Sequence, residues 1–395
     1  MEARNDALAA APRTAEALAH ALVAARDYTQ RMYAHLTVEQ QQFPEIPIVN
    51  LPRWELGHIG WFQEFWCRRY APDDPRGMRT PSRIREADAW WDSARVPHST
   101  RWRLPLPYWG GIDAYLAATL ADTLEALARS RDGERYFFEL ALYHEDMHGE
   151  ALLMTLQSLG LPLPPGMTLS QAKASGANAD IAFPRTTLVL GAQRGDEAGR
   201  FVFDNEKWGH TVTVGPFAIA ETCTTHEEFA QFVDDGGYGR RELWSDAGWH
   251  WRQVGQARHP AYWRRADGAW QMRRFDAWHP LPGGEPVIHV NAYEAEAYCA
   301  WAGRRLPTEA EWQQAAPHLR RGDVWEWTAS EFAPFPGFAA DPYAEYSEPW
   351  FGDHRVVRGA SFATRRRLAH AGFRNFYLPG RGDMFVGFRT CAPAA

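Results

Sequence analysis

The sequence predicts an α+β protein in which a four-helix bundle precedes a domain of short strands and helices. Three observations support this prediction. Apolar residues recur at helical spacing up to about residue 160, a proline-rich segment follows, and the remaining residues form short β-rich runs. The 395 residues are enough for two domains. We therefore expect a bundle over residues 1–160, a linker over 161–184 and an α+β domain over 185–395.

Four amphipathic segments account for the helical part. In each segment, apolar residues stand three or four positions apart, as on one face of a helix. The four series start at Leu18, Trp54, Leu116 and Phe137. We expect the second helix to begin after Pro52 and the third after Gly110-Gly111. Four such helices pack most simply as a bundle, and the long connection over residues 71–109 is of a kind that is often functional.

The residues beyond the linker show a different sequence pattern, with short β-rich runs in place of helical spacing. Apolar and β-branched runs predict strands over residues 186–192 (TTLVLGA), 210–220 (HTVTVGPFAIA) and 286–292 (PVIHVNA). Two short helices are expected, over Thr225–Asp234 and Tyr293–Gly303. Glycine and tryptophan are frequent between them, so we expect much irregular backbone.

The composition excludes several classes of protein. Apolar residues make up 45% of the chain and charged residues 23%, which is ordinary for a globular protein and excludes a disordered or fibrous one. The formal net charge of -7 disfavours a nucleic-acid or anionic-membrane partner. The four cysteines lie far apart, and the chain starts without the apolar core of a signal peptide. These features together predict a cytoplasmic protein.

The most informative motif is HEDMH at residues 144–148. His144 and His148 stand one helical turn apart, so both imidazoles point the same way and can share one metal ion. They fall on the apolar stripe that includes Phe137, Ala141 and Ala151, and we therefore expect them to face the core of the bundle. A pair of core histidines needs polar partners, and a metal ion supplies one to both rings.

A third histidine occupies a similar place on the second helix. His58 lies between Trp54 and Trp61 on the buried stripe. A single buried histidine is usually structural, but three that face one core favour a metal site. Three histidines from two helices can bind one face of a metal and leave the opposite face open for water, oxygen or substrate. That arrangement resembles the facial triad of non-haem iron oxygenases, with a histidine in place of the carboxylate.

The same five residues also match H-E-x-x-H, the zinc-protease motif in which Glu145 would be the general base. Such a protease needs a third ligand downstream. The metzincin histidine is absent after His148, and no glutamate occurs between Glu150 and Glu197. A zinc hydrolase is therefore the less favoured alternative. A binding protein without catalytic activity is another, and it would tolerate the loss of all three histidines.

From about residue 185 the chain resembles the formylglycine-generating-enzyme (sulfatase-modifying factor) domain, which has a C-type-lectin-like fold. Several segments in the family's order carry the resemblance. They are FDNE at 203–206, EPVIHVN at 285–291, YCAWAGRRLPTEAEW at 298–312, DVWEWT at 323–328, RGASF at 358–362 and GFR at 387–389. The copper-dependent formylglycine generators carry a cysteine pair near the end of this domain. Residues 363–388 contain no cysteine, so that activity is not implied.

The N-terminal half resembles DinB-like metal-binding bundles, and the combination of the two halves resembles the sulfoxide synthases of ergothioneine biosynthesis. Those are non-haem iron enzymes that use oxygen to join a sulfur atom to the imidazole C2 of hercynine, the Nα-trimethylated histidine. Their three-histidine iron site is similar to His58, His144 and His148 here. The resemblance therefore implies an Fe(II) cofactor, and hercynine, oxygen and a thiol or selenosugar as substrates.

Two departures from that family bear on the second substrate. Met147 stands beside His148 where the sulfur enzymes usually have glutamine, so it is a candidate substrate contact. Tyr377 aligns where they place an aspartate that holds the amino group of γ-glutamylcysteine. A phenol supplies no negative charge, whereas an aromatic ring suits the apolar face of a sugar.

Residues 54–61 (WELGHIGW) are also more similar to the selenoneine synthases, a sister branch that joins hercynine to a selenosugar. We therefore predict a selenoneine synthase. The alternative is an ergothioneine-type enzyme that uses γ-glutamylcysteine or cysteine.

The resemblance implies further roles in the second domain. Asn375 and Phe376 match the stretch that contacts hercynine, and Arg381 is a candidate for binding an anionic group of the second substrate. Tyr343 is a candidate for the tyrosine that the family uses as a proton or electron donor near iron. An ordinary surface arginine and a packed loop aromatic are the alternative interpretations of Arg381 and Tyr343.

Overall fold

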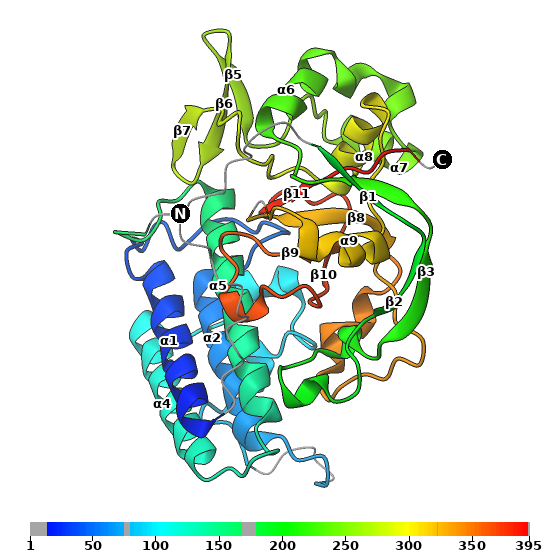
Figure 1. Ribbon diagram of the computed structural model, residues 1–395. Coiled ribbons are helices and arrows are strands. Elements are labelled where there is room, and N and C mark those ends of the chain that lie inside the picture. The colour runs from blue at the N-terminus through cyan, green and yellow to red at the C-terminus, as the bar shows by residue number, and fades with distance from the viewer. Residues whose placement is uncertain (1–13, 75–79, 168–178, 322, 394–395) are drawn as a thin grey trace. The chain divides into compact units, whose positions relative to one another are not determined.

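The computed structural model in Figure 1 describes residues 14–74, 80–167, 179–321 and 323–393. The chain divides into two compact units. The first consists of residues 1–168 with 199–201, and the second of residues 169–198 with 202–395. Among the described residues, no helix is both long enough and apolar enough to cross a bilayer. The structure combines helices and sheets, as the α+β prediction requires.

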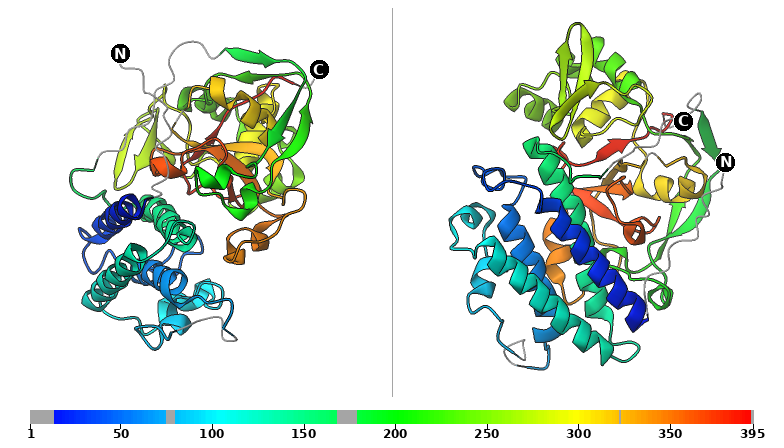
Figure 2. Two further views of the ribbon diagram at one scale, coloured as in Figure 1. Left: turned by 60° about the horizontal axis from the view of Figure 1, so that its bottom comes forward. Right: turned by 90° about the vertical axis from the view of Figure 1, so that its left-hand side faces the viewer.

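Within the part of the first unit that the structure describes, four long helices lie side by side in Figure 2. They are α1 (Ala15–Tyr33), α2 (Pro52–Glu64), α4 (Trp109–Ala128) and α5 (Tyr136–Leu159). Helix α1 packs along α5, and α2 packs along α4 and α5. Apolar side chains of α1, α4 and α5 form one core cluster between them, which includes Leu18, Leu22, Leu127, Phe138 and Leu142. The four helices lie where the apolar series predicted them.

The ends of these helices follow local chemistry. The Thr14 hydroxyl accepts a hydrogen bond from the Ala17 N–H and caps α1. Pro52 is the first residue of α2, whereas we expected the helix to begin after it. At this position the backbone N–H has no partner within the helix, so proline loses no hydrogen bond there. Helix α4 begins at Trp109 and includes the glycine pair that we expected to precede it. Gly160, at φ 67°, closes α5 in the left-handed region.

The connection between α2 and α4 is more ordered than the sequence suggested. A π-helical turn, Phe65–Arg69, extends α2, and the connection contains α3 (Ala87–Trp91) and a 3-10 turn over His98–Arg103. The Arg69 guanidinium donates to both carboxylate oxygens of Asp88, at 2.8 and 2.7 Å, and the Trp61 indole N–H also donates to Asp88. These bonds fix α3 against α2.

The described residues of the second unit form four small sheets. The largest has the strand order β10-β9-β8-β11, with β11 parallel to β8 and the other pairs antiparallel. Its strands are β8 (Trp325–Glu331), β9 (Arg355–Gly359), β10 (Asn375–Tyr377) and β11 (Val386–Phe388). The other sheets pair β1 (Asp180–Phe183) with β4 (Phe217–Ala220), β2 (Thr186–Leu190) with β3 (His210–Val214), and β5 (Trp263–Ala266), β6 (Ala269–Arg274) and β7 (Ala277–Pro280) with one another. Strand β1 begins inside the range expected for the linker.

Two expectations for this unit were wrong. Residues 286–292 are not a strand, because His289 has a positive φ of 61° and Asn291 turns the chain into α8 (Ala292–Trp301). Besides α8 and the expected α6 (His226–Asp234), the unit has α7 (Asp246–Val254) and α9 (Glu309–Ala315). Helix α9 begins with a capping box made by Thr308 and Glu311. With only seven residues, α9 is too short to show a clear helical period, so this capping box is its local sequence signal.

Candidate metal centre

Three histidines of the first unit meet inside the bundle. His58 comes from α2, and His144 and His148 come from α5. One ligand atom from each lies within 4.8 Å of the others, and the Nε2 atoms of His58 and His144 are 3.2 Å apart. Two nitrogens that bind one metal at about 2.1 Å and at right angles lie about 3 Å apart, so the arrangement fits a single ion.

Hydrogen bonds on the outer side orient two of the rings. His58 Nδ1 lies 2.7 Å from the carbonyl oxygen of Trp91, and His148 Nδ1 lies 2.8 Å from Oε1 of Glu55. A carbonyl and a carboxylate only accept, so each Nδ1 carries the proton and donates it. In a neutral ring the lone pair is then on Nε2, the nitrogen that remains for a metal.

Burial keeps two of the three rings neutral. His58 and His144 are 3% and 4% exposed. Desolvation by burial, followed by the neighbouring His148, holds the pKa values of both well below the usual 6.5. Neutral imidazoles are the form that binds a divalent metal, and a set of nitrogen ligands suits iron, zinc or nickel. The residues present therefore fit the iron that the sequence comparison with sulfoxide synthases implied.

Aromatic rings hold the histidines from the sides. The Trp54 indole stacks on His58 with ring centroids 5.0 Å apart, and the Phe62 ring stacks on His144 at 3.5 Å. Gly57 lets α3 approach, because a Cβ at this position would lie 2.1 Å from the Trp91 ring. The Trp91 carbonyl can reach His58 only with that close packing.

Glu145 has a structural role, which differs from the general-base role that the zinc-protease motif predicts. Its carboxylate is 1% exposed and accepts bonds from Arg26 of α1, at 2.8 Å from Nε and 3.2 Å from Nη2. The same guanidinium also donates to Gln63 of α2 and to the Leu116 carbonyl of α4. Arg26 therefore ties the four helices together, and the Glu145 carboxylate is engaged by Arg26 and not positioned as the base of a zinc hydrolase.

The structure brings several other candidates together in the second unit. Asn375 and Tyr377 lie on β10, and the Asn375 side-chain amide donates to the Tyr377 hydroxyl at 3.2 Å. The Arg381 guanidinium lies over the Tyr377 ring, 5.5 Å from its centroid. It also donates to both oxygens of Asp383, at 3.0 and 2.5 Å. Asn375, Tyr377 and Arg381 thus form one partly buried group.

Phe376 and Tyr343 belong to a neighbouring aromatic group. Phe376 stacks on Phe332 with centroids 4.0 Å apart, and it contacts Tyr346 edge-on at 6.1 Å. Tyr343 lies 6.2 Å from the ring of Tyr346. Because successive side chains of a strand point to opposite faces, Phe376 does not share a face of β10 with Asn375 and Tyr377.

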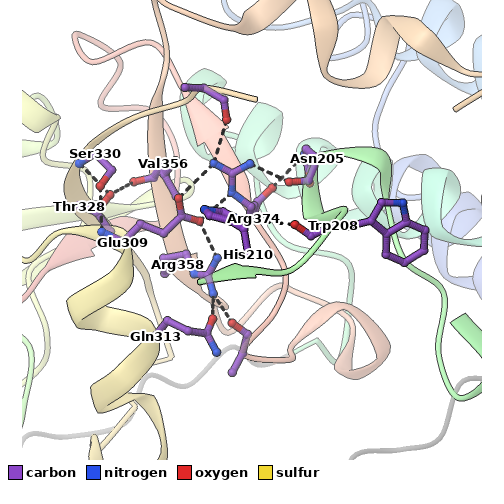
Figure 3. A network of polar contacts seen from close by, with 12 residues as sticks. Asn205, Trp208, His210, Glu309, Gln313, Thr328, Ser330, Val356, Arg358 and Arg374 are labelled. Atoms are coloured by element: carbon purple, nitrogen blue, oxygen red, sulfur yellow. Dashed lines mark hydrogen bonds and ion pairs between the residues drawn. The ribbon is translucent and has the colours of Figure 1, made fainter. Parts of the chain in front are cut away.

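A buried ion network anchors the start of β10 (Figure 3). Glu309 accepts bonds from Arg374 Nε at 2.7 Å and from Arg358 Nη1 at 2.8 Å, and Arg374 also donates to the Asn205 carbonyl. Burial alone would raise the pKa of Glu309, but the two guanidinium groups outweigh it and hold this pKa below its usual value. Arg374 therefore fixes the strand that carries Asn375, Phe376 and Tyr377.

Met147 is half-buried on α5, next to His148. Sequence reasoning missed Glu55, Gly57 and Trp91, which act on the histidines from outside. Two signals were available in residues 54–61: a carboxylate on a helix turn that is otherwise apolar, and a glycine directly before a buried histidine.

This chain is similar to a known domain family and to known full-length proteins. The model of the sulfatase-modifying factor enzyme 1-like domain matches residues 171–320 and 318–394. The hercynine oxygenase of Mycolicibacterium thermoresistibile is 33% identical over 437 aligned residues, which cover 96% of this chain and 95% of that protein. The hercynine oxygenase of Mycolicibacterium smegmatis is also 33% identical, with 95% and 98% covered.

A more distant relative is similar over part of the chain. The ergothioneine biosynthesis protein 1 of Schizosaccharomyces pombe is 27% identical over 233 residues, which cover 49% of this chain and 28% of that protein. The similarity to the two mycobacterial proteins extends over both structural units. It therefore includes the helices that carry the three histidines.

Proposed function

This chain belongs to the hercynine oxygenase family, and from that premise we propose that it is a non-haem iron enzyme that joins a chalcogen atom to the imidazole C2 of hercynine. The observation that carries the proposal is the convergence of His58, His144 and His148 inside the bundle, where burial holds the pKa values of His58 and His144 well below their usual value. Ferrous iron, when bound there, supplies the redox chemistry that oxygen needs and a ligand site for a soft sulfur or selenium atom.

The proposed reaction balances with oxygen as the only oxidant. The C2–H bond of hercynine and the Se–H or S–H bond of the donor break, and a carbon–chalcogen bond forms. One oxygen atom becomes the selenoxide or sulfoxide oxygen, and the other leaves as water with the two hydrogens. Both reactants must be held side by side, since positioning lowers the entropic part of the barrier.

The residues of the second unit have assigned roles in this proposal. Asn375 contacts the hercynine imidazole or carboxylate, and the aromatic face of Phe376 receives the trimethylammonium group. Tyr343 donates a proton near the reacting atoms. In the first unit, Met147, beside His148, is assigned a contact with the donor. The hydrogen bond between Asn375 and Tyr377, on one face of β10, supports a substrate site there, whereas the role of Phe376 on the other face rests on the resemblance to the family.

For the donor we propose a selenosugar. Tyr377 offers a flat ring that is partly buried, and its hydroxyl already accepts a bond from Asn375. Asp383 is the carboxylate that Arg381 engages with two hydrogen bonds, so it does not replace the negative charge that an amino-acid donor needs for its ammonium group. A sugar ring requires no such charge and can stack on the phenol.

A second candidate is an ergothioneine-type reaction with γ-glutamylcysteine or cysteine. The observation in its favour is that a relative carries the name of ergothioneine biosynthesis and that the full-length relatives are hercynine oxygenases. The two candidates share the metal centre and hercynine and differ in the second substrate alone.

A competition experiment separates them. The protein is purified without air, loaded with ferrous iron and given hercynine, oxygen and two donors, a selenoglucose-type selenol and γ-glutamylcysteine. Mass spectrometry then identifies the adduct. A selenium adduct that is lost with His144→Ala supports the proposal, and a sulfur adduct favours the second candidate. With both donors unused and zinc bound as purified, the oxygenase function would be refuted.

A further inference from the structure

Glu55 is a buried carboxylate that touches one of the three histidines. It lies on α2, three residues before His58, and is 1% exposed. Its Oε1 is 2.8 Å from Nδ1 of His148, so a residue of α2 orients a ring that α5 carries. A carboxylate that is removed from water so completely requires specific partners.

The partners of the histidines differ in charge. His148 donates to the anionic carboxylate of Glu55, whereas His58 donates to the neutral carbonyl of Trp91. A hydrogen bond to an anion leaves the imidazole richer in electrons, and this strengthens its other nitrogen as a ligand. The cluster is therefore asymmetric. Of His148 and His58, we expect His148 to be the stronger metal ligand.

A cation also lies near Glu55. The Arg101 guanidinium lies 3.6 Å above the Trp54 ring, which in turn stacks on His58. Arg101 interacts electrostatically with Glu55, and its Nη1 donates to Asn50 at 2.6 Å. Arg101 belongs to the connection between α2 and α4, so this connection offsets part of the negative charge that Glu55 brings into the bundle.

We propose that Glu55 is a positioning residue of the metal centre, which fixes the tautomer and orientation of His148 and raises its strength as a ligand. This inference rests on the proposed function, because it requires that His148 binds a metal. Glu55 acts through His148 and touches neither the metal nor the substrates.

Two substitutions separate the charge of Glu55 from its hydrogen bond. Glu55→Gln keeps an oxygen that can accept from His148 Nδ1 but removes the negative charge, whereas Glu55→Ala removes both. Glu64→Gln is the matched control. Glu64 is also a buried carboxylate of α2, and it accepts bonds from Ser82 at 2.6 Å and from Tyr115 at 2.6 Å.

The measurement uses the full chain and the metal alone. Competition with a chelator gives the Kd for Fe(II) without air, and Co(II) substitution gives the ligand-field absorption bands. We expect Glu55→Gln to weaken metal binding about 10-fold and Glu55→Ala about 100-fold, with shifted Co(II) bands in both. Glu64→Gln should keep the Kd and the bands of the unmodified protein even if its thermal stability falls.

The outcomes are distinct. Unchanged Kd values and Co(II) bands in Glu55→Gln and Glu55→Ala would overturn this inference and leave the proposed function intact. An equal loss of affinity in Glu64→Gln would also overturn it, because the effect would then be one of general stability. If the unmodified chain binds neither metal, the proposed function itself fails. Where Glu55→Ala does not fold, Glu55→Gln alone decides.

Discussion

The carboxylate of Glu145 is clamped by the guanidinium of Arg26, with Nε and Oε1 2.8 Å apart, although Glu145 directly follows a histidine of the candidate metal centre. Both side chains are at most 2% exposed. The ion pair joins α1 to α5. It explains why an H-E-x-x-H motif can occur without the chemistry of a zinc protease.

Loss of Glu145 should destabilise the protein strongly. Glu145→Ala leaves the Arg26 charge buried without its partner, and we expect the free energy of unfolding to fall by about 3–5 kcal/mol. Urea denaturation followed by circular dichroism measures this. Glu125→Ala, which breaks the exposed pair with Arg129, should cost less than about 1 kcal/mol. Equal effects of the two substitutions would contradict the structural role of Glu145.

Each of the three histidines should be necessary for metal binding. His58→Ala, His144→Ala or His148→Ala removes one of three ligands, and bound iron should fall from about one per chain to near zero. Elemental analysis of protein reconstituted without air gives the ratio. His98→Gln is the control, because His98 bonds to the Val49 carbonyl outside the cluster and should leave the iron content unchanged. Full iron content in all three alanine variants would refute the centre.

Gly57 should tolerate no side chain. A Cβ there would overlap the Trp91 ring, so Gly57→Ala must displace α3 and the carbonyl that orients His58. We expect a loss of about 1–3 kcal/mol in unfolding free energy and weaker iron binding. In Gly110→Ala, by contrast, the new Cβ meets no atom within 4 Å, and the variant should be at least as stable as the unmodified protein. Similar melting temperatures for the two variants would argue against the packing described.

The identity of residue 377 should influence the choice of donor. Tyr377→Asp introduces the negative charge that an amino-acid thiol needs, and it should raise the ratio of γ-glutamylcysteine to selenosugar product at least about 10-fold. Tyr377→Phe keeps the ring and removes the hydroxyl that accepts from Asn375, so it should retain the donor preference of the unmodified enzyme. Competition assays read by mass spectrometry test both. An unchanged product ratio in Tyr377→Asp would remove this residue from donor selection.

Asp204 should make the stability of the second unit depend on pH. Burial raises the pKa of this carboxyl from 3.8 to about 6, against the hydrogen bond from Ser347. Below about pH 3 the carboxyl is protonated in both the folded and the unfolded state. Between about pH 4 and 6 the unfolded state ionises first, so the free energy of unfolding falls with rising pH, by up to about 3 kcal/mol.

Asp204→Asn removes this titration and keeps an oxygen that can accept from Ser347. The variant should therefore melt at a higher temperature than the unmodified protein at pH 8 and at nearly the same temperature at pH 4. Thermal melts across this range test the difference, in which the contributions of other groups cancel. A constant difference at all pH values would show that Asp204 does not titrate as described.

The sequence alone was sufficient for features that local periodicity encodes. The apolar series that start at Leu18, Trp54, Leu116 and Phe137 located the four helices, because a buried face must recur every 3.6 residues. The spacing of His144 and His148 placed both on one face for the same reason. The short helices α7 and α9 were not predicted, since nine and seven residues are too few to show a clear helical period.

Only the tertiary structure decided which partners each side chain meets. The sequence separates His58 from His144 by 86 residues, and Arg26 from Glu145 by 119, and no local pattern links either pair. The H-E-x-x-H motif suggested a catalytic base at Glu145, and the lone carboxylate of an apolar helix turn did not reveal which side chain Glu55 would contact. Packing of α1 and α2 against α5 decided both roles, because it brings Arg26 to Glu145 and His148 to Glu55. The role of a buried carboxylate depends on the donor it faces, and here that donor comes from a distant part of the chain.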